Sequence, residues 1–153
     1  MLTAIGALLI GVGAVSVWIT VGIPNESAHT SIVGTDQTDG RVVLVCAVLI
    51  LVVVVASRVV RSRRARELLA GIALISAAVA LVIATAFIAD GKDRNAVLEA
   101  LGIPRTMWAE LGVFRDLGPG AYVVLAGGVL CIAGALLTLR WAQRTKGRGS
   151  SAA

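Results

Sequence analysis

Few residues in this chain have types and spacing that could support chemistry. Three carboxylates, Asp36, Asp39 and Glu110, lie in polar segments, where an enzyme acting on lipid could use them as general acids or bases. With Glu26, the two aspartates could also hold a cation, but their spacing does not match that of a calcium-binding loop. The acidic residues therefore predict no catalytic site and no metal site.

The cysteines and the histidine do not change this conclusion. Cys46 and Cys131 lie at different depths of two predicted helices, roughly 9 Å apart at about 1.5 Å of rise per residue. A disulfide needs Cα atoms within about 7 Å, so we expect two free, buried thiols. His29 is the only histidine and has no cysteine or histidine cluster around it, as a zinc site would need. We expect no cofactor.

The rest of the chain is too apolar for a water-soluble protein of its size. Of the 153 residues, 58% are hydrophobic, against about 45–50% in soluble domains. Four blocks carry no charge in their interior, and about 20 apolar residues suffice to cross about 30 Å of hydrocarbon. The blocks predict transmembrane helices at residues 2–23, 41–60, 68–89 and 118–140. The predicted fold is all-α, an integral membrane four-helix bundle forming one domain over residues 1–141.

Two alternatives concern single blocks. The second block, Val42 to Ser57, is rich in β-branched residues that favour strands, but it is longer than a buried strand and a lone strand cannot satisfy its backbone in lipid. The first block could be a cleaved signal peptide, but its apolar stretch is longer than usual and no Lys or Arg precedes it.

The charges predict the orientation. Five arginines lie between the second and third blocks, with Glu67 as the only acid, and the tail at residues 142–153 is basic and predicted to be disordered. Cytoplasmic loops are rich in Lys and Arg, so this loop and both termini should face the cytoplasm, in the cell membrane. We interpret the loop arginines as determinants of topology that also contact anionic lipid headgroups, rather than nucleic acid. They are Arg58, Arg61, Arg63, Arg64 and Arg66.

The second outer loop carries an amphipathic pattern. Asp93 is a candidate cap for a short helix through Leu101, and a second short helix is predicted from Thr106. Its apolar face would lie on the outer membrane surface, where it could bind a partner or cap its own bundle. The candidate partner contacts are Met107, Trp108, Leu111 and Phe114.

Small residues mark the faces on which the helices should meet, because close backbone approach replaces the hydrophobic drive in lipid. The first, third and fourth helices carry such faces, whereas the second is bulky and should expose more surface. The faces comprise Gly6, Ala7, Gly11 and Gly13; Ala73, Ala77, Ala80 and Ala84; and Gly120, Gly127, Cys131, Gly134 and Ala135. Trp18, near the outer end of the first block, is expected at the depth of the aromatic belt.

Three segments carry a family resemblance: Trp18, the run GTDQTDGRVVLVCAVL from Gly34 to Leu49, and the glycine-rich run GPGAYVVLAGGVLCIAGALLTLR from Gly118 to Arg140. In these features the chain resembles small actinobacterial four-helix membrane proteins of largely unknown function, with a layout similar to the tryptophan-associated membrane proteins. The resemblance implies a multi-pass membrane protein and no catalytic residue.

The functional expectation follows from an apolar bundle without chemistry. We expect a non-enzymatic accessory subunit or scaffold of a membrane complex, which contacts a membrane-protein partner or another copy of itself. The alternative is a small oligomeric transporter or channel, whose pore would have to be lined by serine, threonine and backbone groups, because no charged residue lies inside a block.

Overall fold

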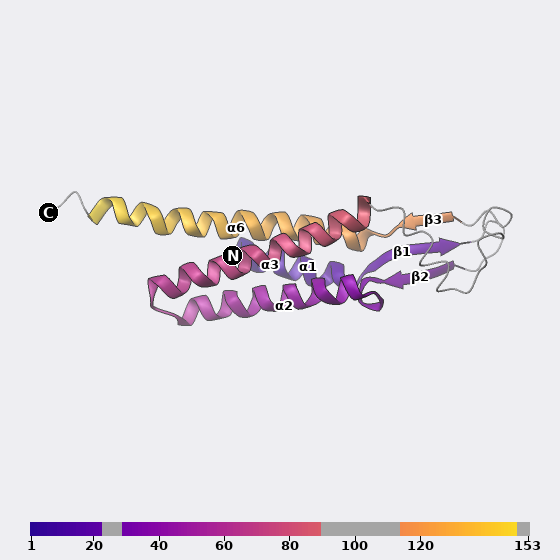
Figure 1. Ribbon diagram of the computed structural model, residues 1–153, viewed down its shortest axis with the longest axis horizontal. Helices are drawn as coiled ribbons and strands as arrows, with labels where there is room; N and C mark the ends of the chain where they lie inside the picture. Colours follow the sequence, from indigo (N-terminus) through magenta and orange to yellow (C-terminus); the bar gives the residue numbers. More distant parts are fainter. Residues whose placement is uncertain (23–28, 90–113, 150–153) are drawn as a thin grey trace.

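The computed structural model describes residues 1–22, 29–89 and 114–149. Within these ranges the chain forms four helices and a small antiparallel sheet (Figure 1). The helices are α1 (Leu2–Ala14), α2 (Thr38–Val59), α3 (Arg63–Ala89) and α6 (Pro119–Gly149). The strands are β1 (Val17–Gly22), β2 (His29–Val33) and β3 (Phe114–Leu117), and a 3-10 turn, η1 (Gly34–Asp36), follows β2.

The first block differs from its prediction. A single helix over residues 2–23 is wrong beyond Ala14, because the chain turns at Val15 and continues as strand β1. The physical reason lies in the run VWITVG, whose β-branched and aromatic side chains favour extended backbone and find two partner strands. At 13 residues, α1 is about 20 Å long.

The other three helices are long and apolar enough to cross a membrane. They lie close to the predicted spans, although α3 begins five residues earlier than residue 68, at Arg63. The tail prediction is wrong as far as Gly149, because α6 continues through residues 142–149 as helix. This stretch lacks proline, and its first glycine is Gly147, so no strong helix breaker follows Arg140 directly.

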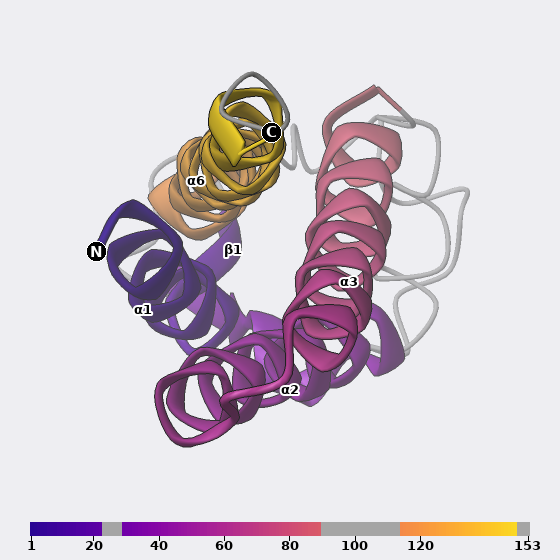
Figure 2. The same ribbon diagram turned by 90° about the vertical axis from the view of Figure 1, so that its left-hand side faces the viewer.

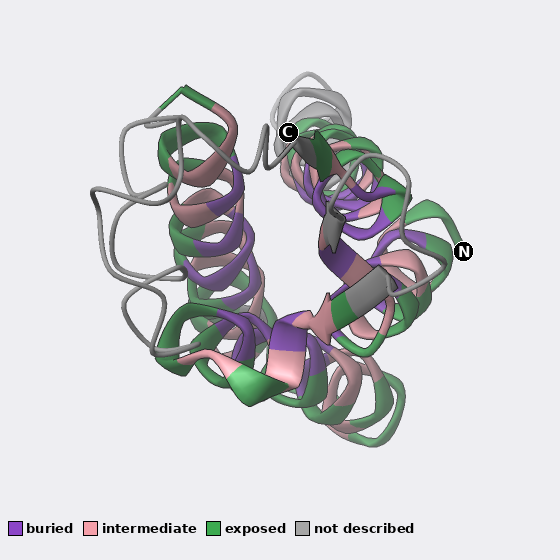
Figure 3. Cartoon of the chain, turned by 90° about the vertical axis from the view of Figure 1, so that its right-hand side faces the viewer, coloured by how far each residue is buried: buried purple, intermediate pink, exposed green. Residues whose placement is uncertain are grey.

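The four helices pack side by side, in the order α1-α2-α3-α6 around the bundle, with α6 back against α1. α1 contacts α2 and α6, and α3 also contacts α2 and α6, so that each helix has two neighbours (Figure 2). Their buried residues face the centre (Figure 3). The outward faces remain apolar, with Val45, Val52 and Ile75 more than half exposed. The prediction that the second helix exposes more surface than the third is wrong, since both bury 28% of their most apolar window.

The closest approach is between α1 and α6, which run in opposite directions. A Cβ atom added at Gly6 would lie 2.6 Å from the Gly127 carbonyl oxygen, and one added at Gly13 would lie 2.7 Å from the Gly120 carbonyl oxygen. Both pairs are spaced seven residues apart, two helical turns, so they recur on one face of each helix. The small-residue faces predicted for these two helices therefore meet.

The sheet lies at the end of the molecule opposite the α2–α3 turn (Figure 1). Its strand order is β2-β1-β3, with β1 in the centre and antiparallel to both neighbours. Thr20 pairs with Ser31 on one side and with Asp116 on the other. The register shifts between Val17 and Ile19, at the position of Trp18.

Candidate functional site

Trp18 joins the helices to the sheet. It belongs to β1, yet its side chain is fully buried. Its indole Nε1 donates a hydrogen bond of 2.8 Å to the carbonyl oxygen of Gly13, in α1. The ring also meets Phe87 of α3 edge to face, with centroids 4.7 Å apart and planes at 63°. Trp18 is thus a packing residue between the helices and the sheet, and its depth relative to the aromatic belt stays a prediction.

Glycines from two other segments make room for this ring. An added Cβ at Gly120 would lie 2.6 Å from Trp18 Cδ1, and one at Gly34 would lie 2.5 Å from Nε1. Backbone hydrogen bonds lock the same segments together, because Gly34 N donates to Ser16 O at 3.0 Å and Gly118 N donates to Trp18 O at 2.8 Å. We call Trp18, Gly13, Gly34, Gly118 and Gly120 the Trp18 junction.

The polar residues beside the junction stabilise its turn. The Asp36 carboxylate accepts a hydrogen bond of 3.2 Å from Val33 N, and Arg41 Nε donates one of 2.9 Å to Thr35 O. Both bonds tie η1 to its neighbours, β2 and α2. Asp36 and Asp39 are both exposed, and the bond to Val33 N gives Asp36 a local structural role.

Metal binding finds no support in the part of the chain that the structure describes. Within it, no group of three or more His, Cys, Asp or Glu side chains is placed to hold a metal ion. Glu26 and Glu110 lie outside that part.

The Trp18 junction holds the sheet in a fixed relation to the helices. Each of α1, α3, η1 and α6 contributes a contact to it, through Gly13, Phe87, Gly34 and Gly120. The described strands then expose polar side chains such as Ser31 and Asp116. An arrangement of this kind can present a binding surface.

Of the four candidate partner contacts, Phe114 is the one that lies within the described residues. Met107, Trp108 and Leu111 lie outside the described residues. Phe114 begins strand β3, so the prediction that it belongs to a short helix is wrong. The pairing of β3 with β1, in which Phe114 lies opposite Gly22, gives its backbone partners that a helix prediction from local periodicity ignores.

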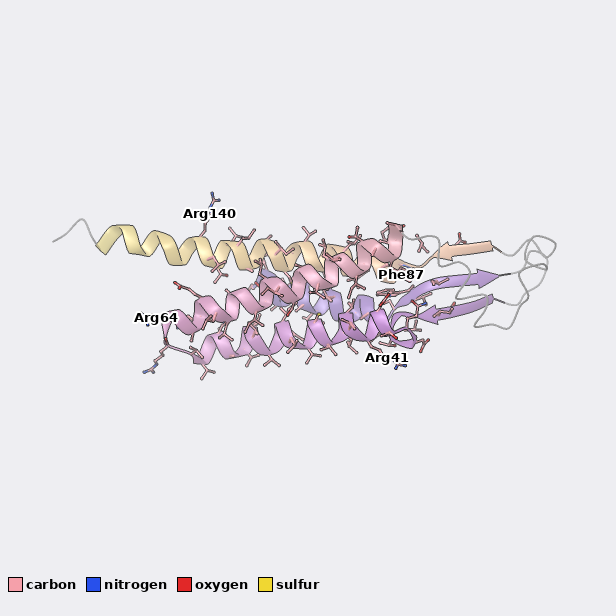
Figure 4. The ribbon with its side chains drawn as sticks, viewed as in Figure 1. Arg41, Arg64, Phe87 and Arg140 are labelled. Atoms are coloured by element: carbon pink, nitrogen blue, oxygen red, sulfur yellow. The ribbon has the colours of Figure 1, made fainter. Side chains whose placement is uncertain are left out.

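The predicted topology arginines lie at the opposite end of the molecule. Arg58, Arg61, Arg64 and Arg66 are exposed at or beside the α2–α3 turn, and Arg63 begins α3. Figure 4 shows Arg64 at this end of the molecule. Arg66 Nε donates a hydrogen bond of 2.8 Å to Val60 O, which holds this side chain against the end of α2. Arg41 and Phe87, in contrast, lie at the sheet end of their helices (Figure 4).

The two cysteines are free and buried, as predicted. Cys131 lies on the α1–α6 contact, where its Sγ donates a hydrogen bond of 3.3 Å to Thr3 O. Cys46 belongs to the packed face of α2. Both act as small packing residues rather than as a redox pair.

The three segments that carry the resemblance meet at the Trp18 junction. Trp18, Gly34 and Gly118–Gly120 are distant in sequence and adjacent in space. Sequence reasoning identified the segments but not their contact, nor the sheet beside them. The signal that could have indicated the sheet is the run of β-branched and aromatic residues from Val17 to Val21.

A comparison with protein-family models found no match to this chain, and neither did a comparison with curated proteins.

Proposed function

We propose that the chain is a non-enzymatic integral membrane protein that serves as an accessory subunit or scaffold of a membrane complex. The observation that carries this proposal is the Trp18 junction, which fixes a sheet to one end of the apolar helices. A sheet held in place in this way suits recognition of a partner, because an ordered surface loses little conformational entropy on binding.

Insertion in a membrane is supported by the outward faces of the helices. Three helices have the length and composition of a span, and their exposed residues are mainly valine, leucine and isoleucine. α1 runs beside α6, from Gly134 near Thr3 to Gly120 near Gly13, which supports placing it in the same apolar layer despite its length. In this proposal the arginine-rich turn faces the cytoplasm and the sheet faces outside.

Transport is the weaker alternative. Ser76 is the only polar residue among the buried side chains of the described ranges, and fully buried Ile10 and Ile50 occupy the middle of α1 and α2. Among the buried side chains of the described ranges, an ion or a polar substrate would therefore meet Ser76 and otherwise apolar groups within one copy of the chain. The same apolar centre supports the non-enzymatic proposal.

The proposal is tested by photo-crosslinking in the native membrane. A photoreactive amino acid is placed at Ser31 or Asp116 on the sheet, or at Trp108 in the outer loop. The matched control is Val55, which is 66% exposed on the outward face of α2. We expect one and the same partner protein to be crosslinked from the sheet positions and not from Val55.

Extraction in mild detergent gives the second measurement. The partner should co-purify with the wild-type protein and be lost after alanine substitution of Trp108 and Phe114. A protein that is extracted as a single species, with no adduct from Ser31, Asp116 or Trp108, would show that the scaffold proposal is wrong.

A further inference from the structure

A cavity of about 300 Å³ lies between the helices at the arginine-rich end. All four helices contribute to its wall, and it lies far from the Trp18 junction. The described residues that bound it on α2 and α3 include Val53, Ser57, Arg58, Arg66 and Ala73. Its volume is at the lower end of the range for small-molecule sites, about 300–1,000 Å³.

The inner part of this cavity is apolar. Ala73, Val53 and Ala135 are buried and come from three different helices. Val54 and Ala70 are half-buried and extend the same surface. A hydrocarbon chain would contact these side chains without leaving a polar group of its own unpaired.

The polar groups of the wall lie near the helix ends. The hydroxyls of Ser57 and Thr138 donate to carbonyl oxygens of their own helices, Val54 O at 2.7 Å and Gly134 O at 2.8 Å. These two hydroxyl protons are therefore already hydrogen-bonded within the protein, and neither hydroxyl requires a ligand as an acceptor. The donors that favour an anion are the guanidinium groups of Arg58 and Arg66, which lie on two adjoining helices.

We propose that this cavity binds an anionic phospholipid of the adjoining leaflet, with its phosphate at Arg58 and Arg66 and the first part of one acyl chain against the apolar wall. The inference rests on the membrane placement proposed above. Arginines at the ends of membrane helices lie at the depth of the headgroups, where a lipid phosphate is also found. Basic pockets between membrane helices on the cytoplasmic side are suited to such headgroups.

A neighbouring pair of arginines supplies the matched control. Arg61 lies in the α2–α3 turn and Arg64 in the first turn of α3; both are exposed and neither lines this cavity, although Arg64 borders a separate hollow on α3. Diffuse attraction to an anionic surface depends on the total charge, so it would fall equally when either pair is neutralised. A built site depends on Arg58 and Arg66, which line the cavity beside Met1 and Thr3, and not on Arg61 or Arg64.

The experiment measures lipid binding to the purified full chain in detergent. Native mass spectrometry and the Tm are recorded with added phosphatidylglycerol, phosphatidylcholine or inorganic phosphate. We expect the wild type to retain phosphatidylglycerol and to gain Tm from it. Arg58→Gln with Arg66→Gln should weaken binding by about tenfold or more, and Arg61→Gln with Arg64→Gln should leave it unchanged.

Three results would overturn the inference. Equal retention of phosphatidylglycerol and phosphatidylcholine would show that no anion is recognised. An equal loss in both arginine pairs would show surface attraction only. Full displacement of the lipid by inorganic phosphate would make the free anion the occupant, instead of the lipid.

A second variant tests the cavity without changing charge. Ala70→Phe introduces a ring at a half-buried wall position, and it should abolish retention of phosphatidylglycerol while both arginines remain. Unchanged lipid retention in this variant would show that the acyl chain does not enter the cavity. Membrane placement is measured separately by carbonate washing of membranes. Release of the wild-type protein by the wash would contradict the proposed function. A protein that stays in the membrane but shows no lipid preference would contradict only this inference.

Discussion

At the scale of single residues, the described glycines differ widely in what surrounds them. Gly127 faces α1 so closely that an added Cβ would lie 2.7 Å from the Gly6 carbonyl oxygen and 2.8 Å from Ile10 N. Gly71, in α3, has no atom within 4 Å of an added Cβ. The two positions therefore separate the effect of a close helix contact from the effect of removing a glycine.

Gly127→Val should destabilise the protein by about 1–3 kcal/mol, because the backbones of α1 and α6 must move apart to admit the side chain. Gly71→Ala should be neutral or stabilising by up to about 1 kcal/mol, from helix propensity alone. Denaturant unfolding in detergent micelles measures both free energies. Equal stabilities of the two variants would contradict the packing described for α1 and α6.

The residue scale also shows what the sequence predicts well. Small residues on three helices indicated the packed faces, and Ala73, Ala77, Ala80 and Ala84 are all buried. Trp18 was expected inside a helix that runs to residue 23, whereas it lies in β1 and is fully buried. Its burial depends on Gly34 and Gly120, which no local pattern connects to it.

At the scale of elements, two runs of β-branched residues have opposite outcomes. α2 contains VVVV and is helical, whereas VWITVG forms strand β1. Intrinsic preference is similar in both, so it does not decide between them. The α2 run continues for the length of a membrane span, and the β1 run has β2 and β3 as partners. The length of the first charge-free block predicted a single helix over residues 2–23. Block length contains no information on the distant strands that pair with β1.

The register of the sheet can be tested with cysteine pairs. Thr20 lies directly opposite Asp116, and such antiparallel pairs have Cα atoms about 4.5–5.5 Å apart, a distance that a disulfide spans. In a background with Cys46→Ala and Cys131→Ala, the pair Thr20→Cys with Asp116→Cys should oxidise readily. Mass spectrometry of peptides from the oxidised protein detects the bond.

The control shifts the partner by one residue. Leu117 lies opposite Ile19 and points to the other face of the sheet from Asp116, so Thr20→Cys with Leu117→Cys should remain reduced. If the shifted pair forms the disulfide instead, the register of β1 and β3 is different from the one described.

At the scale of the whole molecule, the two ends differ in charge and in architecture. Arginines surround the α2–α3 turn, and the sheet occupies the other end (Figure 1). The charge-free blocks predicted four membrane-spanning helices, of which three have the length of a span in the described residues, and the run of arginines predicted a basic end. The sequence did not predict which helices are neighbours, nor the cavity between them. Both depend on residues of separate helices that meet only in the folded chain.

Orientation in the membrane can be measured with a reagent that does not cross it. Ser31 on the sheet and Arg61 in the basic turn are both exposed, and each is replaced by cysteine in the background without native cysteines. We expect Ser31→Cys to be labelled in intact cells and Arg61→Cys only after permeabilisation, because arginine-rich loops stay in the cytoplasm. The reverse pattern would place the sheet in the cytoplasm.

The pairing of α1 with α6, and of β1 with β3, has a consequence for biosynthesis. The ribosome makes α1 and β1 first, and their partners α6 and β3 emerge only after α2 and α3. A nascent chain therefore holds α1 without its main neighbour until α6 has been made, whereas α2 and α3 can associate as soon as both exist. Addition of α6 is thus the step that closes the molecule, and a truncation that removes α6 leaves α1 without its main neighbour, whereas β1 keeps β2 and β3.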